Sequence, residues 1–263
     1  VLDLGGAGSG GESDVVIVAA GATLNAPGVI SFTATSATKN NSTGAGNATL
    51  TAADGGNRTI SVAAATGSSK AFTLTGGNGN DTLTGGAGTD IITGSAGNDI
   101  ITGGAGNDII TVDVGTDTVL DLGGAGGDED DVVVIEAGAT LAATGIAGFT
   151  ATNVTTNKST GAGNATLTAK ADAAVTINVS GAKSDSKGFT LEGGSGTGND
   201  ILTGGAGADI ITGGAQVDTI TGGGEVDTIA GGAGNDIITA GAGNDIITVD
   251  VGTDTVLDLG GAG

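Results

Sequence analysis

The chain has 263 residues, of which 29 are acidic and only 7 basic, so its formal net charge is −22. This charge argues against nucleic acid as a partner and would repel an anionic membrane surface, while divalent cations are the natural counter-charge. The absence of cysteine and histidine excludes disulfides, thiolate metal sites and the commonest general base, and no apolar run is long enough for a transmembrane segment.

Residues 1–14 read as the end of a preceding repeat, and residues 15–75 as a spacer of β-strands. The spacer is rich in Ala, Thr and Val, and short stretches alternate apolar with polar residues, as in Phe72-Thr73-Leu74-Thr75. Such period-2 runs bounded by Gly and Asn are typical of strands. Two architectures remain open: further coils of a parallel β-solenoid, or a small antiparallel sandwich. The direct run from Thr75 into Gly76 favours the solenoid.

Residues 76–122 form a distinct segment that opens with four nonapeptides in unbroken register. Their sequences from Gly76 to Thr111 are GGNGNDTLT, GGAGTDIIT, GSAGNDIIT and GGAGNDIIT. Glycines at the first, second and fourth places permit a positive φ, so we expect tight turns there whose carbonyl oxygens point to one side. The sixth-place aspartate adds a carboxylate, and Ca²⁺ prefers such hard oxygens. After each turn the eighth residue should face inward, giving the ladder Leu83, Ile92, Ile101 and Ile110.

The chain also repeats itself over a longer period. Residues 14–77 align with 131–194 at a constant offset of 117, and the sequence VLDLGGAG occurs at 1–8, 119–126 and 256–263. We therefore expect a linker at 123–131, a second β spacer at 132–192, a second roll at 193–257 and the start of another repeat at 258–263. The stretches 112–120 and 249–257 lose the opening glycines and are interpreted as closing turns.

The nonapeptides resemble the repeats-in-toxin (RTX) family, whose parallel β-roll winds two nonapeptides per turn and holds several calcium ions between loops stacked on one edge. The resemblance implies an all-β fold in which a calcium β-roll alternates with the spacers. It also implies metal ligands among the sixth-place aspartates and the opening glycines. These are Asp81, Asp90, Asp99, Asp108, Asp117, Asp200, Asp209, Asp218, Asp227, Asp236 and Asp245, with Gly76, Gly85, Gly103, Gly204, Gly213 and Gly231.

Several positions depart from the family pattern. Gln216 and Glu225 replace the fourth glycine, Ser95 replaces a second and Ala240 a first. We expect weaker sites at the Gln216 and Glu225 loops. The seventh place, which should face outward, is often Ile, as at Ile91 and Ile109. Either β-propensity alone or a face covered by another copy of the protein explains this choice.

Three classes of function fit the sequence. The first is a non-enzymatic structural protein of the bacterial cell surface, a surface-layer or filament subunit that folds on binding calcium and self-associates. The second is the extender region of a calcium-dependent adhesin, and the third is the C-terminal roll of a secreted enzyme or toxin. The family resemblance implies export by a type I route. Contact with cell-surface glycans is a further expectation for the first two classes.

Overall fold

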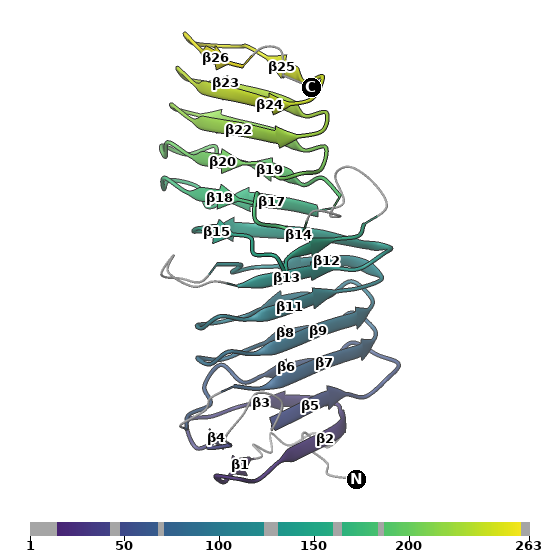
Figure 1. Cartoon of the computed structure of the whole chain (residues 1–263). Coiled ribbons are helices and arrows are strands. Elements are labelled where there is room, and N and C mark those ends of the chain that lie inside the picture. The colour runs from purple at the N-terminus through teal and green to yellow at the C-terminus, as the bar shows by residue number, and fades with distance from the viewer. Residues whose placement is uncertain are drawn as a thin grey trace.

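The fold is a β-solenoid built from parallel strands. The computed structural model describes residues 15–42, 48–67, 71–123, 131–159, 165–183 and 187–258, and these residues contain no helix. Every paired strand runs parallel to its neighbours, and successive coils stack from the N-terminal end to the C-terminal end (Figure 1). The expectation of an all-β parallel solenoid is confirmed. The described residues contain no helix that could span a membrane.

An 11-stranded sheet runs along the stack and joins the two modules. Successive coils contribute one strand each to this sheet, so neighbours in it are never consecutive in the chain. In order they are β3 (Ser31–Thr33), β6 (Thr59–Ser61), β8 (Thr82–Thr84), β10 (Ile100–Thr102), β12 (Gly115–Val119), β14 (Ala139–Ile146), β17 (Ala165–Ala169), β19 (Thr190–Glu192), β21 (Ile210–Ala215), β23 (Thr228–Ala233) and β25 (Ile246–Thr248).

Two shorter sheets cover the remaining faces of the solenoid. The 7-stranded sheet contains five strands of the first module, β2 (Leu24–Val29), β5 (Ala48–Ala52), β7 (Thr73–Asn78), β9 (Ile91–Ala96) and β11 (Ile109–Val112), and two of the second spacer, β13 (Val132–Ile135) and β16 (Thr156–Asn157). The 6-stranded sheet lies in the second module and contains β15 (Phe149–Thr150), β18 (Thr176–Asn178), β20 (Ile201–Thr203), β22 (Thr219–Gly224), β24 (Ile237–Ala242) and β26 (Thr255–Leu257). A separate pair joins β1 (Ile17–Val18) to β4 (Lys39–Asn40).

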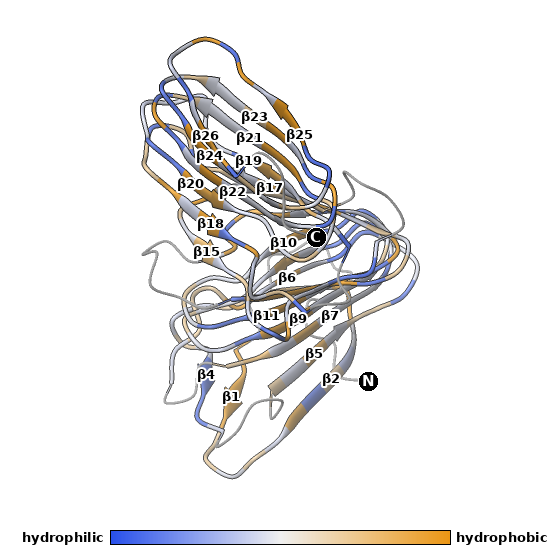
Figure 2. Cartoon of the chain, turned by 45° about the horizontal axis from the view of Figure 1, so that its top comes forward, coloured by the Kyte–Doolittle hydropathy of each residue, from blue (hydrophilic) through white to orange (hydrophobic). Residues whose placement is uncertain are grey.

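The roll coils contain two nonapeptides each. Ile91 pairs with Ile109 and Ile100 with Thr82, so one coil advances the chain by 18 residues. The eighth-place ladder of Leu83, Ile92, Ile101 and Ile110 is fully buried between the two sheets, as predicted. Figure 2 shows hydrophobic segments recurring in strands of successive coils. Because each coil buries its apolar residues mainly against its neighbours, stacking builds a continuous core.

The spacers are wider coils of the same solenoid, which excludes the sandwich alternative. β5 pairs with β7 at Thr49 and Thr73, so this coil takes 24 residues, and the extra length makes a third side. All four phenylalanines of the chain are buried in these wider coils. At the third side the side chain of Asn40 accepts hydrogen bonds from the backbone and hydroxyl of Ser42, and donates to the Ala71 carbonyl. Asn157, 117 residues later, likewise accepts a hydrogen bond from the backbone N–H of Ser159 and donates to the Gly188 carbonyl.

Corresponding strands of the two modules lie in different sheets, and so on different faces of the solenoid. β2 lies in the 7-stranded sheet, whereas its counterpart 117 residues on, β14, lies in the 11-stranded sheet. The junction itself is continuous pairing: Ile109 to Val132 between β11 and β13, and Thr118 to Ala142 between β12 and β14. The first roll therefore serves as the platform on which the second spacer stacks.

Some expected segments fall outside the described residues. These are the end of the preceding repeat at 1–14, all but Gly123 and Asp131 of the expected linker at 123–131, and all but Asp258 of the next repeat at 258–263. The copies of VLDLGGAG are described only in their parts at 119–123 and 256–258.

The seventh-place isoleucines face outward, but most are separated by threonine. Ile100 lies between Thr82 and Thr118, and Ile237 between Thr219 and Thr255. In the 7-stranded sheet, in contrast, Ile91, Ile109 and Val132 stand in one uninterrupted row. The sides of the solenoid thus carry small apolar patches rather than the long isoleucine rows that the repeats alone suggested.

Candidate metal centre

The sixth-place aspartates form a hydrogen-bonded ladder along each roll. One carboxylate oxygen, Oδ1, accepts a hydrogen bond from the backbone N–H of the aspartate in the preceding coil. Asp99 accepts from Asp81 at 2.8 Å, and Asp236 from Asp218 at 2.9 Å. Further bonds of this kind join Asp90 to Asp108, Asp99 to Asp117, Asp200 to Asp218, Asp209 to Asp227, Asp227 to Asp245 and Asp236 to Asp254. The ladder fixes one oxygen and leaves the other to a different partner.

The first aspartates of each roll bind the spacer instead. Asp90 accepts from the N–H of Phe72 at 2.6 Å, and Asp209 accepts from the N–H of Phe189, also at 2.6 Å. Asp81 accepts from Arg58, and Asp200 from Val175. The spacer backbone therefore ends each ladder, which explains why no linker separates the spacer from the roll.

The second carboxylate oxygen, Oδ2, is buried without a hydrogen-bond partner in most of the ladder. This group comprises Asp81, Asp99, Asp108, Asp117, Asp218, Asp227, Asp236 and Asp254. A buried, unpartnered carboxylate oxygen costs several times more than a neutral polar atom, because its hydration is lost without replacement. A cation beside each Oδ2 would remove that cost.

Three turns satisfy Oδ2 differently. The N–H of the second-place glycine donates to it at Asp90, Asp200 and Asp209, over 2.6, 2.9 and 2.7 Å. These second-place glycines do not take a positive φ, whereas Gly77, Gly104, Gly214, Gly223 and Gly232 do, and the aspartates of their repeats keep Oδ2 unpartnered. The orientation of one peptide thus decides whether the turn presents a free carboxylate oxygen.

The first-place glycines lie directly against this oxygen. A Cβ added at Gly85 would lie 2.5 Å from Oδ2 of Asp90 and would also meet the carbonyl oxygen of Gly103, one coil on. Gly213 stands in the same relation to Asp218, at 2.6 Å, and to the carbonyl of Gly231. Carboxylate and carbonyl oxygens therefore converge on the space that a side chain would fill, and both are ligands that Ca²⁺ prefers.

The expectation of a positive φ at the first place is wrong. None of the first-place glycines in the described rolls has one; the positive values lie at the second and fourth places. Glycine suits the first place because of close approach, since a Cβ on any of these glycines would lie within 3 Å of Oδ2 of the aspartate in its own repeat. Ala240 holds the first place in the last repeat, whose Asp245 is only half-buried. Ser95, Gln216 and Glu225 take positive φ values of 74°, 80° and 67° although they are not glycine.

Burial raises the pKa of many of the ladder carboxylates. The pKa of Asp108 rises to about 8 and that of Asp227 to about 7, first because of desolvation and further because of neighbouring carboxylates. Asp90, Asp117 and Asp218 rise to about 6 for the same leading reason, and backbone hydrogen bonds partly oppose the shift. Stacked carboxylates without a positive charge between them therefore resist ionisation.

The residues predicted as ligands occupy equivalent places. Of the eleven aspartates, all but Asp245 are buried, and Asp245 is half-buried in the ladder near the C-terminal end. Each of the six predicted glycines, namely Gly76, Gly85, Gly103, Gly204, Gly213 and Gly231, lies against Oδ2 of the aspartate in its own repeat. The residues present therefore fit calcium, and their assignment as ligands remains a prediction.

Sequence reasoning missed other carboxylates of the ladder. Asp131 is buried and accepts hydrogen bonds from the N–H groups of Asp108 and Gly123, at 2.8 and 2.7 Å. Its position directly before the Val132-Val133-Val134-Ile135 run, like an aspartate before Ile-Ile-Thr, was the available signal. Asp121 closes the first roll by accepting from the N–H of both Gly103 and Gly104.

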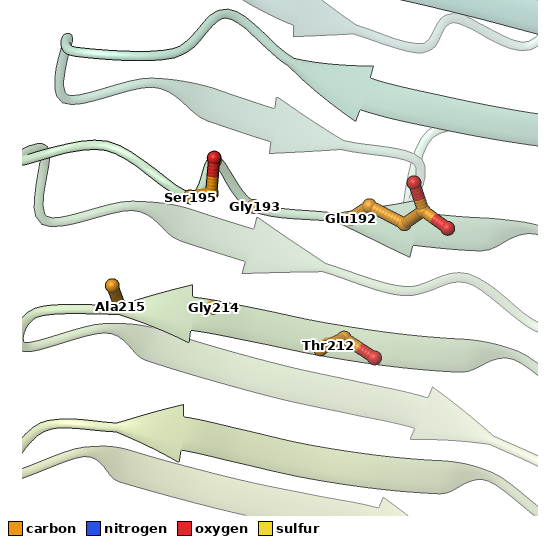
Figure 3. Close-up of a pocket in the computed structure, with 7 residues that line it drawn as sticks. Glu192, Gly193, Ser195, Thr212, Gly214 and Ala215 are labelled. Carbon is orange, nitrogen blue, oxygen red and sulfur yellow. The ribbon is translucent and has the colours of Figure 1, made fainter.

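An open hollow of about 420 Å³ lies at the start of the second roll. It is lined by Glu192, Gly193, Gly194, Ser195, Thr212, Gly214 and Ala215 (Figure 3). Glu192 supplies the only charged side chain and accepts a hydrogen bond from the Thr168 hydroxyl. The lining contains no aromatic ring on which a sugar could stack, so the hollow gives no support to the expected glycan contact.

Comparison with known families agrees with the geometry. The sequence model of the RTX calcium-binding nonapeptide repeat matches four times, at residues 73–99, 84–119, 194–229 and 221–256. No curated protein and no solved structure matches the chain. The four matches coincide with the two segments in which the aspartate ladder is regular. Residues 73–119 and 194–256 are therefore RTX calcium-binding repeats folded as a β-roll.

Proposed function

We propose that this protein is a non-enzymatic extracellular structural protein that folds when it binds calcium and assembles at the bacterial cell surface. The observation that carries the proposal is the row of buried, unpartnered Oδ2 atoms along both rolls. Without metal these oxygens and their raised pKa values oppose folding. With calcium, the free energy of binding becomes free energy of folding.

The aspartates and first-place glycines named above would hold the calcium, several ions to each roll. Bound calcium supplies positive charge and oxygen coordination, which replaces the hydration lost when the carboxylates are buried. The chain's own part is to bring the oxygens into register through the backbone bonds to Oδ1. Extracellular calcium at about 10⁻⁴–10⁻³ M is the range in which such modules bind.

Far-UV circular dichroism tests the coupling between calcium and folding. The spectrum in excess chelator should be that of a largely disordered chain, and millimolar calcium should restore a β-rich spectrum. Magnesium at the same concentration serves as the control, because its small octahedral shell suits these carbonyl-rich loops less well. A chain equally β-rich in chelator and in calcium would contradict the proposal.

Assembly is the second part of the proposal, and the module junction supports it. Residues 105–126 and 242–263 are identical in sequence. In the first copy, β13 and β14 cover the ladder and bury Val112 completely; in the second, Val249 at the same place is 57 % exposed. Because the two segments are identical, a coil like β13–β14 also fits the turn around Val249. Residues 15–29 of a second copy correspond to that coil at the 117-residue offset.

We therefore favour end-to-end stacking over contacts between the sides of two solenoids. On the sides, threonine interrupts most rows of exposed isoleucine, so the apolar patches there are small. We expect this chain in calcium to form linear oligomers, measured by sedimentation velocity. Val249→Asp places a charge in the proposed contact and should abolish them. Val154→Asp is the matched control, because Val154 is similarly exposed but lies in a turn on the side of the solenoid. A wild-type chain that stays monomeric at high concentration would overturn the stacking proposal.

The extender region of an adhesin is the second candidate, favoured by the same end-to-end geometry. A stalk needs rigid modules in series within one chain, whereas a surface lattice also needs lateral contacts. Electron microscopy of the protein refolded with calcium separates isolated rods from sheets or fibres. We keep the division into modules (15–75 with 76–122, and 132–192 with 193–257), export by a type I route and the glycan contact as parts of the proposal.

A further inference from the structure

The closing turns of both rolls differ from the repeats at the second place. The sequence VDVGTDTVL stands at 112–120 and at 249–257, so Asp113 and Asp250 occupy a place that is glycine in nearly all of the repeats. Oδ1 of Asp250 accepts a hydrogen bond from the N–H of Gly232, the second-place glycine one coil earlier, at 3.0 Å. The contact holds the Asp250 carboxylate against the roll.

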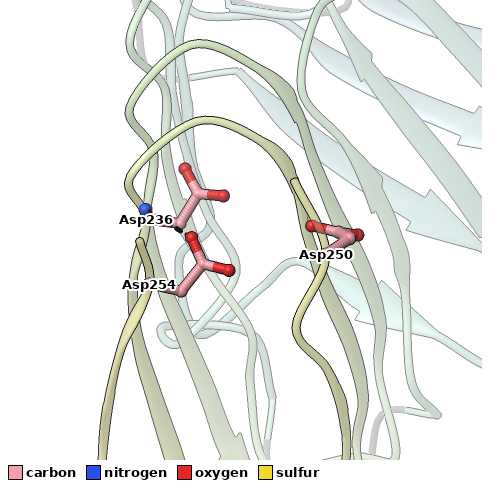
Figure 4. Close-up of side chains that lie close together, drawn as sticks. All are labelled: Asp236, Asp250 and Asp254. Carbon is pink, nitrogen blue, oxygen red and sulfur yellow. Dashed lines mark hydrogen bonds between the residues drawn. The ribbon is translucent and has the colours of Figure 1, made fainter. Parts of the chain in front are cut away.

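Asp250 forms a cluster with two aspartates of the ladder. One oxygen from each of Asp236, Asp250 and Asp254 lies within 4.8 Å of the others. Figure 4 shows the carboxylates of Asp236 and Asp254 next to each other, with Asp250 facing them from the other side of the turn. Among the described residues this is the only group of three acidic side chains brought so close. Asp99, Asp113 and Asp117 occupy the same places at the end of the first roll, but their carboxylates do not come within this distance of one another.

The cluster has unused oxygen atoms. Asp236 is fully buried, and its Oδ1 is bonded to Asp218 while its Oδ2 has no partner. Oδ2 of Asp254 is also buried and unpartnered. The one salt bridge recorded among the described residues joins Lys158 to Glu136, in the second spacer, so no basic side chain neutralises the three carboxylates. A cation bound between these carboxylates would replace the hydration that the buried oxygens have lost.

We propose that Asp236, Asp250 and Asp254 form a calcium site of higher affinity than the repeat sites, which closes the second roll. The inference rests on the proposed calcium binding of the rolls and adds a ligand that the nonapeptide pattern does not contain. In a regular turn the second-place residue has no side chain, so the site there draws on carboxylates from the sixth place only. A third carboxylate raises the negative charge at the site, and ligand charge is a main determinant of calcium affinity.

The substitution Asp250→Gly gives a sharp test, because it restores the family pattern at the second place. Calcium is titrated into the chelator-treated chain by isothermal calorimetry, and bound calcium is counted by equilibrium dialysis. The wild type should show one site tighter than the rest. Asp250→Gly should weaken that site by roughly tenfold or more, as expected for loss of a charged ligand. The β-rich spectrum at saturating calcium should stay unchanged.

Two further variants complete the experiment. Asp250→Asn keeps the size and the acceptor for Gly232 but removes the charge, so it should weaken the tight site even if the glycine variant folds poorly. Asp172→Asn removes one exposed carboxylate from a spacer turn and should leave the titration unchanged. A tight site retained in both Asp250 variants would overturn the inference. Absence of calcium binding in the wild type would instead overturn the proposed function, so the two failures are distinct.

Discussion

At the scale of single residues, each ladder aspartate divides its two oxygens between different tasks. Oδ1 accepts the backbone N–H of the previous coil and so sets the register, while Oδ2 remains buried and free in most repeats. The two tasks explain why a carboxylate is needed where a turn alone would accept asparagine. Substitutions that change one oxygen and keep the other can separate them.

Asp108→Asn should have opposite effects with and without calcium. The amide keeps an oxygen for the N–H of Asp90 but removes the charge beside the metal, so the calcium concentration at half-folding should rise. In chelator above about pH 8, where folded Asp108 is ionised, the folded state of the variant should be less unfavourable than that of the wild type by about 1–3 kcal/mol, because a buried unpartnered charge is gone. Calcium titrations and circular dichroism in chelator measure the two effects. Destabilisation under both conditions would contradict the division of tasks.

The raised pKa values predict a dependence on pH in chelator. Unfolded aspartate has its ordinary pKa of 3.8, whereas folded Asp108 and Asp227 titrate at about 8 and 7. Between these values the folded state binds more protons, so the free energy of unfolding decreases as the pH rises. Stability present below about pH 4 is lost as the pH rises through about 6 to 8. Circular dichroism of the chelated chain should show more β structure at acid pH, and the reverse order would refute the argument.

At the scale of the turn, the fourth place shows how far the pattern tolerates change. Gln216 and Glu225 hold a left-handed backbone that favours glycine, yet their strands β22 and β23 pair regularly with the neighbouring coils. The neighbouring coils impose the conformation and the turn stores the strain. The same applies to Ser95 at the second place of its repeat.

Gln216→Gly should therefore stabilise the calcium-bound protein by roughly 1 kcal/mol, since glycine removes the steric cost of a positive φ. Thermal unfolding at saturating calcium gives the measurement. Gln216→Ala is the matched control: it also shortens the side chain but keeps the Cβ, so it should bring no such gain. Equal stabilisation by both substitutions would show that the side chain, and not the backbone strain, is responsible.

Much of the element scale was predictable from the sequence, because the nonapeptide fixes a turn and a strand locally. The buried ladder of Ile92, Ile101 and Ile110 follows from the period alone. The third side of the spacer coils was not predictable, since it depends on Asn40 reaching Ala71 across 31 residues. The role of Asp131 was predictable only in part: it precedes an apolar run as the repeat aspartates do, but no nonapeptide surrounds it and its partner Asp108 lies in the preceding coil.

At the scale of the whole molecule, the solenoid grows by adding coils. Each coil contacts mainly its neighbours, so the length of a roll can change without disturbing the rest. The second roll has two more nonapeptides than the first, yet both end in the same closing turn. What the repeat does not specify is the change of face between modules, since that follows from how β13 and β14 stack on β11 and β12.

Deleting residues 213–230 removes two nonapeptides, which is one whole coil. The shortened chain should still fold in calcium, because Thr212 would then join Gly231 in the same register. It should bind fewer calcium ions and show a smaller denaturant m-value, since less surface is exposed on unfolding. Dialysis and urea unfolding in calcium measure both. Failure of the shortened chain to fold at any calcium concentration would contradict the modular account.

Hydrogen exchange followed by mass spectrometry tests the central claim most directly, because it locates the effect of calcium along the chain. Peptides covering 76–122 and 193–257 contain the N–H groups that bind Oδ1 of the ladder. Calcium should convert these peptides from rapid to slow exchange in both rolls. Equal protection of the roll peptides in chelator and in calcium would contradict the claim that calcium drives their folding.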